Sequence, residues 1–386
     1  MPTPIKPSSS LEVPTSTSSW TPLPLSAQEL DLDFTLPTGQ SFRWRKTSPS
    51  VYTGVIGNRL VQVSQRESHL REKRKKIASS SASSPGAAET AAAAFRVLKE
   101  ADAFSSTSSA SEQLADYFNA HISLAPMASS WALSDPRWRT AGSVVRGARV
   151  LRQPPLECLL SFICSSNNSI GRITGMVEHL ARRYGTLLAS AEEVEELLRE
   201  EEEGEGEELA VKKEEEQNEE APATPLKPSA ALSSSGARPS PRAPFYSFPT
   251  LRQLSGSVTE ADLRDAGFGY RAKYIVGTVE ALAALSRERA GSKSKSKSSK
   301  KSKDEDEKLD DDDFLLSLRE APQEEALREL AKLPGVGPKV AACVALFSLD
   351  KHAVVPVGKV TKFLILKFFL NFFIFRVFLL FSMPKT

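Results

Sequence analysis

The chain has 386 residues, of which 40% are hydrophobic, and a formal net charge of +2 at neutral pH. This length allows two or three domains and a sizeable core. The charge is unevenly spread, because residues 192–220 hold 16 of the 48 acidic and three of the 50 basic side chains. The remainder therefore carries a charge of +15, with 47 basic and 32 acidic groups. A basic remainder is typical of a polyanion-binding surface and equally of an ordinary solvated one, so charge alone leaves nucleic-acid binding open.

The cysteines exclude several classes of protein. Only Cys158, Cys164 and Cys343 are present, and no two of them have CxxC spacing. A disulfide scaffold, a zinc site and an iron–sulfur cluster are therefore disfavoured, and no metal is expected. The first residues do not resemble a secretory leader, so we expect a reducing compartment.

Two basic runs bear on localisation. Residues 71–76 and 293–303 are similar to nuclear-import signals, although such runs are also common in linkers. We expect a nuclear protein. Residues 1–20 are rich in Ser, Thr and Pro and poor in acidic groups, with one lysine and no arginine, which leaves mitochondrial targeting open.

Apolar patterning changes along the chain and predicts two domains of different type. Residues 30–64 alternate apolar and polar positions between turn residues, which is typical of short antiparallel strands. Helical spacing follows at 156–185, with a polar break at Ser165–Ser169, and again at 258–285 and 314–332. The sequence therefore predicts an α+β fold, with an antiparallel β-domain followed by a helical domain.

The segments divide as follows. We predict a disordered leader at 1–19, a β-domain at 20–150, a helical domain at 151–357 and a hydrophobic tail at 358–386. Three stretches lack apolar periodicity and are expected to be low-complexity or disordered insertions, at 71–111, 200–243 and 286–313. Cys158 and Cys164 fall on the apolar stripe of a helix and are expected in the core.

A tight turn at "LPGVG", residues 333–337, separates two predicted helices. Pro338 suits the first turn of the second helix, and two glycines allow an exposed backbone. A helix, a Gly-x-Gly hairpin and a second helix can grip a DNA phosphate. The backbone N–H groups of Gly335, Val336, Gly337 and the first helical turn would then point at the anion.

Lys339 falls in the first turn of this second helix, among apolar neighbours. A positive helix end and apolar surroundings both disfavour an ammonium and favour the neutral amine that nucleophilic attack requires. The alternative is a lysine that simply meets a phosphate. This segment alone does not separate the two interpretations.

Four stretches together resemble one family of DNA repair enzymes. They are "LPTGQSFRWR" (36–45), "LRQPPLECLLSFICSSNNSIGRITGMVEHL" (151–180), "GFGYRAKYI" (267–275) and "LPGVGPKVAAC" (333–343). The last is similar to the hairpin of helix-hairpin-helix base-excision DNA glycosylases, and the four together resemble eukaryotic 8-oxoguanine DNA glycosylase. The resemblance implies a monomeric, bifunctional glycosylase and lyase that acts on duplex DNA containing 8-oxoguanine opposite cytosine, without a cofactor or a membrane partner.

The resemblance also implies roles for individual residues around a base that is flipped out of the duplex. Asn167 matches the residue that enters the vacated space, Arg172 and Arg271 match the arginines that bond the estranged cytosine, and Tyr270 matches an aromatic wedge. Singly, these residues could instead be a helix cap, surface arginines and a core tyrosine. An arginine fork suits the cytosine acceptors, and an aromatic face can replace lost stacking.

The same resemblance assigns the damaged base and the nucleophile. Gly39 matches the glycine whose carbonyl accepts a hydrogen bond from N7–H of 8-oxoguanine, a hydrogen that guanine lacks. Cys343 matches a cysteine that packs against the flipped base. Lys339 matches the lysine that attacks the deoxyribose and forms a Schiff base, which permits β-elimination.

The sequence departs from the family after "VVPV" at 354–357. An aspartate is expected next, but Gly358 stands there, and the remaining residues hold eight of the 19 phenylalanines. The tail could be a membrane anchor, a replacement helix or translated intron. An aspartate codon interrupted after its first G by an intron beginning GTAAGGT would read Gly-Lys-Val, as 358–360 do. We favour this third interpretation, and with it loss of activity; a non-catalytic DNA-binding fragment is the alternative function.

Overall fold

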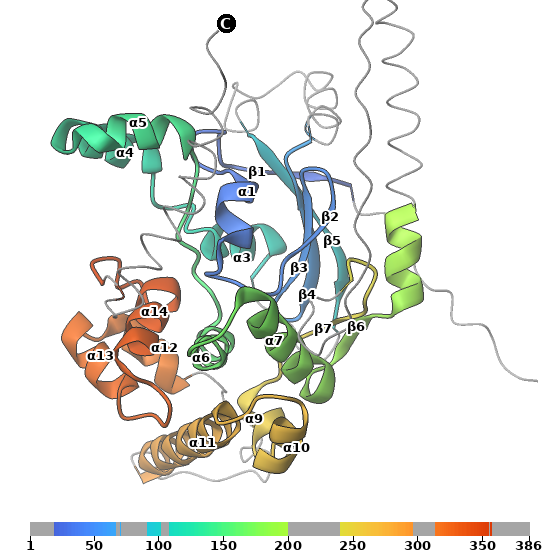
Figure 1. Ribbon diagram of the computed structural model, residues 1–386, viewed down its shortest axis with the longest axis vertical. Helices are drawn as coiled ribbons and strands as arrows, with labels where there is room; N and C mark the ends of the chain where they lie inside the picture. Colours follow the sequence, from blue (N-terminus) through green and yellow to red (C-terminus); the bar gives the residue numbers. More distant parts are fainter. Residues whose placement is uncertain are drawn as a thin grey trace, which may run out of the picture.

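The computed structural model describes residues 19–66, 70, 91–101, 108–199, 240–295, 313–354 and 356. The predicted leader up to residue 18, most of each predicted insertion and the tail with Gly358 lie outside the described residues. Figure 1 shows a β-sheet in one half of the molecule and a group of helices in the other, with helix α6 between them. The predicted α+β fold, with the sheet first and the helices second, is confirmed.

The sheet has five antiparallel strands in the order β1-β5-β4-β3-β2. Its strands are β1 (Thr21–Leu23), β2 (Arg45–Ser48), β3 (Val51–Ile56), β4 (Arg59–Ser64) and β5 (Ala93–Glu100). Gly57, at φ 60°, turns the β3–β4 hairpin. One face of the sheet packs on α3 (Ala110–Tyr117) through side chains such as Val61 and Phe95.

Two predictions for the β-domain are wrong in part. The start of 30–64 is helical, with α1 (Leu32–Thr35) followed by the short 3₁₀ helix η1 (Leu36–Thr38). The side chain of Asp31 caps α1 by accepting a hydrogen bond from the Phe34 N–H at 3.0 Å. The predicted insertion 71–111 contains strand β5, which pairs with both β1 and β4. The strand was missed because it begins with alanines, which fit the crowded centre of the sheet but continue an Ala-rich stretch of the sequence.

The helical half is built around α6 (Pro155–Cys164) and α14 (Pro338–Ser348), which pack against each other. The other helices are α7 (Ile170–Tyr184), α9 (Leu251–Leu254), α10 (Glu260–Asp265), α11 (Arg271–Lys295), α12 (Asp313–Glu320) and α13 (Gln323–Leu330). The helix predicted at 314–332 is therefore two helices, because Pro322 cannot continue α12 and caps α13. Helix α11 also runs ten residues into the predicted insertion 286–313.

The predicted core positions are confirmed. Cys158 and Cys164 are fully buried in the cluster around α6, and Cys343 of α14 belongs to the same cluster. Two more helices, α4 (Leu124–Ser134) and α5 (Pro136–Val144), project from the β-domain on the side of the molecule that carries α14 (Figure 1). In the described ranges, no helix has both the length and the hydrophobicity needed to cross a bilayer.

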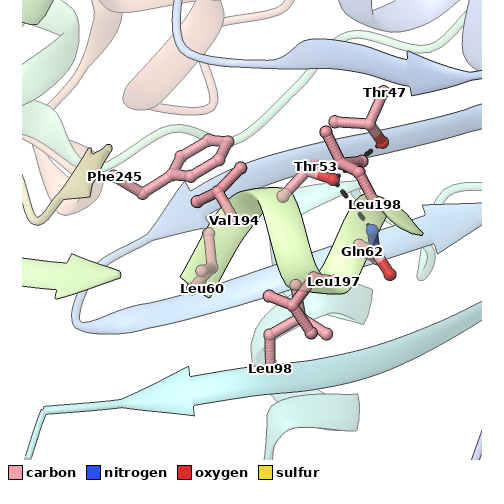
Figure 2. Close-up of a pocket in the computed structure, with 9 residues that line it drawn as sticks. All are labelled: Thr47, Thr53, Leu60, Gln62, Leu98, Val194, Leu197, Leu198 and Phe245. Atoms are coloured by element: carbon pink, nitrogen blue, oxygen red, sulfur yellow. Dashed lines mark hydrogen bonds between the residues drawn. The ribbon is translucent and has the colours of Figure 1, made fainter. Parts of the chain in front are cut away.

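The other face of the sheet is covered by residues 191–199, which are helical, and by the two-stranded sheet of β6 (Leu187–Ala189) and β7 (Phe245–Tyr246). A cavity remains there (Figure 2), with lining residues Thr47, Thr53, Leu60, Gln62, Leu98, Val194, Leu197, Leu198 and Phe245. It offers about 10 Å³ to a water-sized sphere, which is room for one water molecule at most. This cavity is too small and too apolar to be a substrate site.

Candidate active site

The candidate nucleophile lies where α6 and α14 meet. Lys339 is the second residue of α14, after Pro338, as the sequence predicts. Its Nζ donates a hydrogen bond to Oγ of Ser165 at 2.7 Å, and it lies 5.4 Å from the centroid of the Phe162 ring. Both partners belong to the C-terminal end of α6, so a side chain on one helix is held by the end of another that lies 174 residues away in sequence.

The hairpin before Lys339 is seated on α11. Gly335 has φ of +77°, and a Cβ there would lie 2.5 Å from Cβ of Tyr274. Thr278, one turn further along α11, donates a hydrogen bond from Oγ1 to the carbonyl of Pro334 at 2.7 Å. Only glycine accommodates both the left-handed backbone and the close approach of Tyr274. The hairpin is thus fixed by contacts with α11 before any DNA is bound.

The hairpin amides differ from the prediction in one respect. The N–H of Val336 donates to the carbonyl of Leu333 at 3.1 Å, and the Val336 side chain is buried, so this amide is already used within the turn. The first bond of α14 runs from the N–H of Ala341 to the carbonyl of Gly337 at 2.9 Å. The N–H groups of Lys339 and Val340 come before that bond and have no acceptor within the helix. An anion would therefore meet these amides and that of Gly337 rather than that of Val336.

A second group of predicted residues gathers at the loop between α6 and α7. Tyr270 donates from its hydroxyl to the carbonyl of Ser166 at 2.9 Å. The guanidinium of Arg271 donates to the carbonyls of Ser166, at 3.1 Å from Nε, and of Asn167, at 2.9 Å from Nη2. The Arg271 guanidinium also lies 4.6 Å from the Tyr270 ring centroid. Asn167, Tyr270 and Arg271 are thus brought together from segments about 100 residues apart.

The exposure of these side chains sorts them into two kinds. Tyr270 is 47% exposed, and the side chain of Asn167, at φ of +46°, is also exposed. Arg172, in the first turn of α7, is exposed as well. Arg271 is only 5% exposed, and the backbone carbonyls of the loop occupy its donors. In this structure Arg271 holds the loop in shape, while the other three side chains face solvent.

Gly39 lies on a loop that a polar network ties to the helical domain. Its φ of 84° and ψ of 14° are left-handed, which ends η1. The side-chain amide of Gln40 donates to the carbonyl of Arg149 at 2.8 Å, and its oxygen accepts from the N–H of Leu151 at 3.0 Å. The side-chain amide of Gln153 donates to the carbonyl of Gln40 at 2.7 Å. The loop is therefore held on the 149–153 segment.

Gln153 continues the network to the end of α14. Its N–H donates to the carbonyl of Phe347 at 2.9 Å, and its carbonyl accepts from Oγ of Ser348 at 2.7 Å. Neither Gln40 nor Gln153 was predicted as a site residue. The partners that tie them to other segments lie more than 100 residues away. Only their being polar residues within the motif stretches 36–45 and 151–180 could have drawn attention to them.

Three phenylalanines connect the Gly39 loop to Lys339. The Phe42 ring meets that of Phe162 edge-on at 6.0 Å, and Phe162 stacks on Phe347 at 5.5 Å with an interplanar angle of 15°. Lys339 lies over the same Phe162 ring. Phe162 and Phe347 were not predicted as site residues. Phe42 and its neighbours Arg43 and Trp44 all have packed or ion-paired partners in the described structure.

Cys343 lies one helical turn beyond Lys339 and is 4% exposed. Burial raises the pKa of its thiol to about 11, although the charge of Lys339 acts in the opposite direction. The group is therefore a neutral thiol at physiological pH. Among the described residues, no three His, Cys, Asp or Glu side chains gather to hold a metal ion.

Solved structures share this arrangement of sheet and helices. The 8-oxoguanine glycosylase/lyase of Clostridium acetobutylicum, in complex with duplex DNA containing cytosine opposite 8-oxoguanine, has a TM-score of 0.53 and 20% identity over 88% of this chain and 80% of that one. Its apo form has a TM-score of 0.52 over 92% and 83% of the two chains, also at 20% identity. The fold is that of the 8-oxoguanine glycosylases, a class of enzymes that remove bases from DNA.

Sequence comparisons narrow the class to a family. The family model described as "8-oxoguanine DNA glycosylase, N-terminal domain" matches residues 22–159. N-glycosylase/DNA lyase OGG1 of Arabidopsis thaliana is 38% identical over 345 residues, which are 89% of this chain and 67% of the relative. The Saccharomyces cerevisiae N-glycosylase/DNA lyase is 31% identical over 63% of this chain and 47% of its own length. The chain belongs to the 8-oxoguanine DNA glycosylase/lyase family and is by homology an N-glycosylase/DNA lyase.

Proposed function

We propose that this protein excises 8-oxoguanine from duplex DNA through a Schiff base on Lys339, and that the same intermediate gives the strand-cleaving lyase step. The observation that carries the proposal is the place of the Lys339 amine. It lies directly after the hairpin, at the start of a helix whose first amides have no acceptor within the helix, at the junction of two buried helices, and beside the neutral thiol of Cys343. The identity of 38% with an Arabidopsis N-glycosylase/DNA lyase supports this reaction class.

The chemistry follows from an amine at that position. The Lys339 nitrogen forms a bond to the anomeric carbon, the bond from that carbon to the base breaks, and the base leaves with the electron pair and takes a proton. Opening of the sugar ring leaves an imine between the lysine and C1′. Loss of a proton from C2′ then expels the 3′ phosphate by β-elimination, and hydrolysis releases the lysine.

The surrounding residues supply recognition in this proposal. Asn167, exposed on the α6–α7 loop, enters the space that the flipped nucleotide vacates, and Tyr270, exposed beside that loop, is the aromatic wedge. Arg172 bonds the cytosine left without a partner. Arg271 acts first as the support of that loop and reaches the cytosine only by exchanging a carbonyl partner. Gly39 offers its carbonyl to N7–H of the damaged base, from a loop held by Gln40 and Gln153.

We further propose that the chain as printed, with Gly358 and the tail that follows it, turns over substrate poorly. The aspartate expected after Val357 is replaced by Gly358, and in the family's reaction a carboxylate at that place would stabilise positive charge developing on the sugar. The residues from 357 onward lie outside the described structure. A translated intron accounts for Gly-Lys-Val at 358–360, and sequencing of the mature transcript across codons 355–362 tests it: a single continuous exon through the tail contradicts it. The second candidate function is a DNA-binding fragment without turnover, which the same substitution at 358 favours.

The proposal extends to the setting of the enzyme. Its substrate is duplex DNA with 8-oxoguanine opposite cytosine, it acts as a monomer, and it works in the nucleus. The charge of +15 outside residues 192–220 supports a polyanionic partner. A fluorescent fusion expressed with and without residues 71–76 and 293–303 tests the localisation. Unchanged nuclear import of the protein lacking both runs would show that they are not its import signals.

Borohydride trapping tests the nucleophile. A form of the protein in which Val357 continues into an aspartate-containing segment should give a covalent adduct on duplex containing 8-oxoguanine opposite cytosine, and Lys339→Gln should abolish it. Lys332→Gln is the matched control, because Lys332 is an exposed lysine near the hairpin that pairs with Glu329 at 2.7 Å. The printed chain should give little product on the same duplex. Normal turnover by the printed chain would contradict the proposed loss of activity.

A further inference from the structure

We infer that Ser165 is a positioning residue for Lys339, holding the amine so that its lone pair faces away from α6 and toward the bound sugar. The inference rests on the proposed function of Lys339 as the nucleophile and names a residue that acts through it. It was not apparent from the sequence, where Ser165 only begins a polar break between two helices.

The hydrogen bonds of Ser165 leave it a single way to interact with Lys339. Its hydroxyl lies 2.7 Å from the carbonyl oxygen of Phe162, which can only accept, and 2.7 Å from Nζ of Lys339. A serine hydroxyl has one hydrogen and two lone pairs. Because the hydrogen is committed to Phe162, the oxygen must accept an N–H from Lys339 and cannot donate to the nitrogen.

This direction of the hydrogen bond matters for a nucleophile. A neutral amine carries two hydrogens and one lone pair, and an ammonium carries three hydrogens. A partner that donated to the nitrogen would occupy the lone pair and block attack. Ser165 instead binds one of the hydrogens, which leaves the lone pair free and directs it away from the serine. The same contact can form in both protonation states, so the amine need not move before it reacts.

The backbone is held by hydrogen bonds at Ser165 itself and at the residue that follows it. The N–H of Ser165 donates to the carbonyl of Ser161 at 3.1 Å, which continues the fully buried helix α6. The next residue, Ser166, is fixed through its carbonyl by Tyr270 and Arg271. The Phe162 ring lies under the amine at 5.4 Å and attracts its positive form. A shift of Lys339 relative to the sugar would therefore require a shift of the end of α6.

Two substitutions at one position separate positioning from folding. Ser165→Ala removes the acceptor, whereas Ser165→Thr keeps the hydroxyl. With duplex DNA containing an abasic site, the single-turnover rate of borohydride-trapped adduct should fall about tenfold to a hundredfold in Ser165→Ala, the range expected for loss of one oriented hydrogen bond to a reacting group. Ser165→Thr should restore the rate to within about threefold, and neither change should alter the Kd for the duplex by more than about twofold.

A small reagent gives the opposite expectation and needs no catalysis by the protein. Formaldehyde with cyanoborohydride needs no particular orientation of the amine. Release from Ser165 should let the half-buried amine of Lys339 move into solvent, which should speed its methylation relative to Lys332 by at least about threefold for one lost hydrogen bond. Peptide mass spectrometry of the full chain measures both lysines in one sample. Ser165→Thr should label as the unaltered chain does.

The outcomes distinguish this inference from the proposed function. An unchanged trapping rate in Ser165→Ala, or equal methylation of Lys339 in all three proteins, overturns the positioning role. Absence of any adduct from the unaltered chain, or an adduct that survives Lys339→Gln, overturns the proposed nucleophile. In that case methylation still decides whether Ser165 holds the amine.

Discussion

Helices α6 and α4 are both rich in apolar residues, yet all ten residues of α6 are buried and none of the 11 residues of α4 is. Helix α6 is enclosed by α7, α11, α12 and α14, and it carries the partners of Lys339 at its end. Helix α4 packs mainly on α5, where Trp131 and Trp138 meet edge-on at 4.9 Å. Apolar composition thus predicts burial only where the fold supplies a surface to cover it.

The two helices are also anchored differently. The carboxylate of Glu29 holds the start of α4 by accepting from the N–H groups of Leu124 at 2.7 Å and Ala125 at 3.0 Å. These hydrogen bonds, together with that of Ser123, hold the pKa of Glu29 below its ordinary value although burial acts in the opposite direction. Figure 1 shows that α4 and α5 then extend away from the sheet. The candidate site is held by two helices, α6 and α14, that pack along each other, whereas the α4–α5 pair is attached to the β-domain mainly at the start of α4.

A matched pair of leucine truncations tests this contrast and should give the largest difference in the free energy of unfolding. Leu159→Ala in α6 removes a fully buried side chain and should lower the free energy of unfolding by about 2–5 kcal/mol. Leu133→Ala in α4, where the leucine is 89% exposed, should change it by less than about 0.5 kcal/mol. Urea denaturation of both variants measures the difference. A cost at Leu133 equal to that at Leu159 would show that α4 is covered in solution.

A smaller effect concerns the hairpin that α11 holds against α14. Gly335→Ala should cost about 1–3 kcal/mol of stability, because alanine is strained at φ of +77° and its Cβ would meet Tyr274 at 2.5 Å. Gly337→Ala is the control, since a Cβ there meets nothing within 4 Å and should cost less than about 0.5 kcal/mol. Thermal unfolding compares the two. Equal melting temperatures would mean that the hairpin does not rest on Tyr274 as described.

The last test uses Glu157, the one acidic residue among the ten buried residues of α6. Burial raises its pKa from 4.5 to about 7, against the opposing charge of Arg43 at 3.7 Å, and nearby Glu178 acts in the same direction as burial. The folded protein therefore binds this proton more tightly than the unfolded chain does. Stability should consequently fall as pH rises from about 4.5 to about 7.

Glu157→Gln tests that pH dependence. The amide cannot release a proton, so the variant should lose the part of the stability decline that Glu157 causes. Denaturation at about pH 4 and about pH 7.5 brackets the window in which the carboxyl titrates. The same decline in the variant and the unaltered chain would assign the effect to other groups.

Much of the fold could be read from local patterns. The strands between residues 45 and 64, the helices on either side of Ser165 and the position of Lys339 in a first helical turn all depend on residues close in sequence. The division of 314–332 into α12 and α13 was missed, although Pro322 marks it in the sequence. Strand β5 was not, because small residues that suit a crowded sheet also compose flexible linkers.

The site was harder to predict than the elements that form it. The hydrogen bonds from Arg271 to Asn167 and from Lys339 to Ser165 join residues 104 and 174 positions apart. The periodicity of apolar residues in a sequence cannot predict such a contact. The contacts of Phe162 with Phe42 and Phe347 likewise depend on how the β-domain docks on α6 and α14. Motif resemblance selected Lys339 as the proposed nucleophile, and only the packing of helices revealed which residues hold it.

The central claim is that Lys339, held at the end of α6, is the nucleophile of this glycosylase. Borohydride trapping with abasic duplex DNA tests it most directly, because imine formation with the exposed aldehyde needs the lysine but no base pocket. The account predicts a covalent adduct with the printed chain and with Lys332→Gln, and none with Lys339→Gln. An adduct that persists in Lys339→Gln would contradict it.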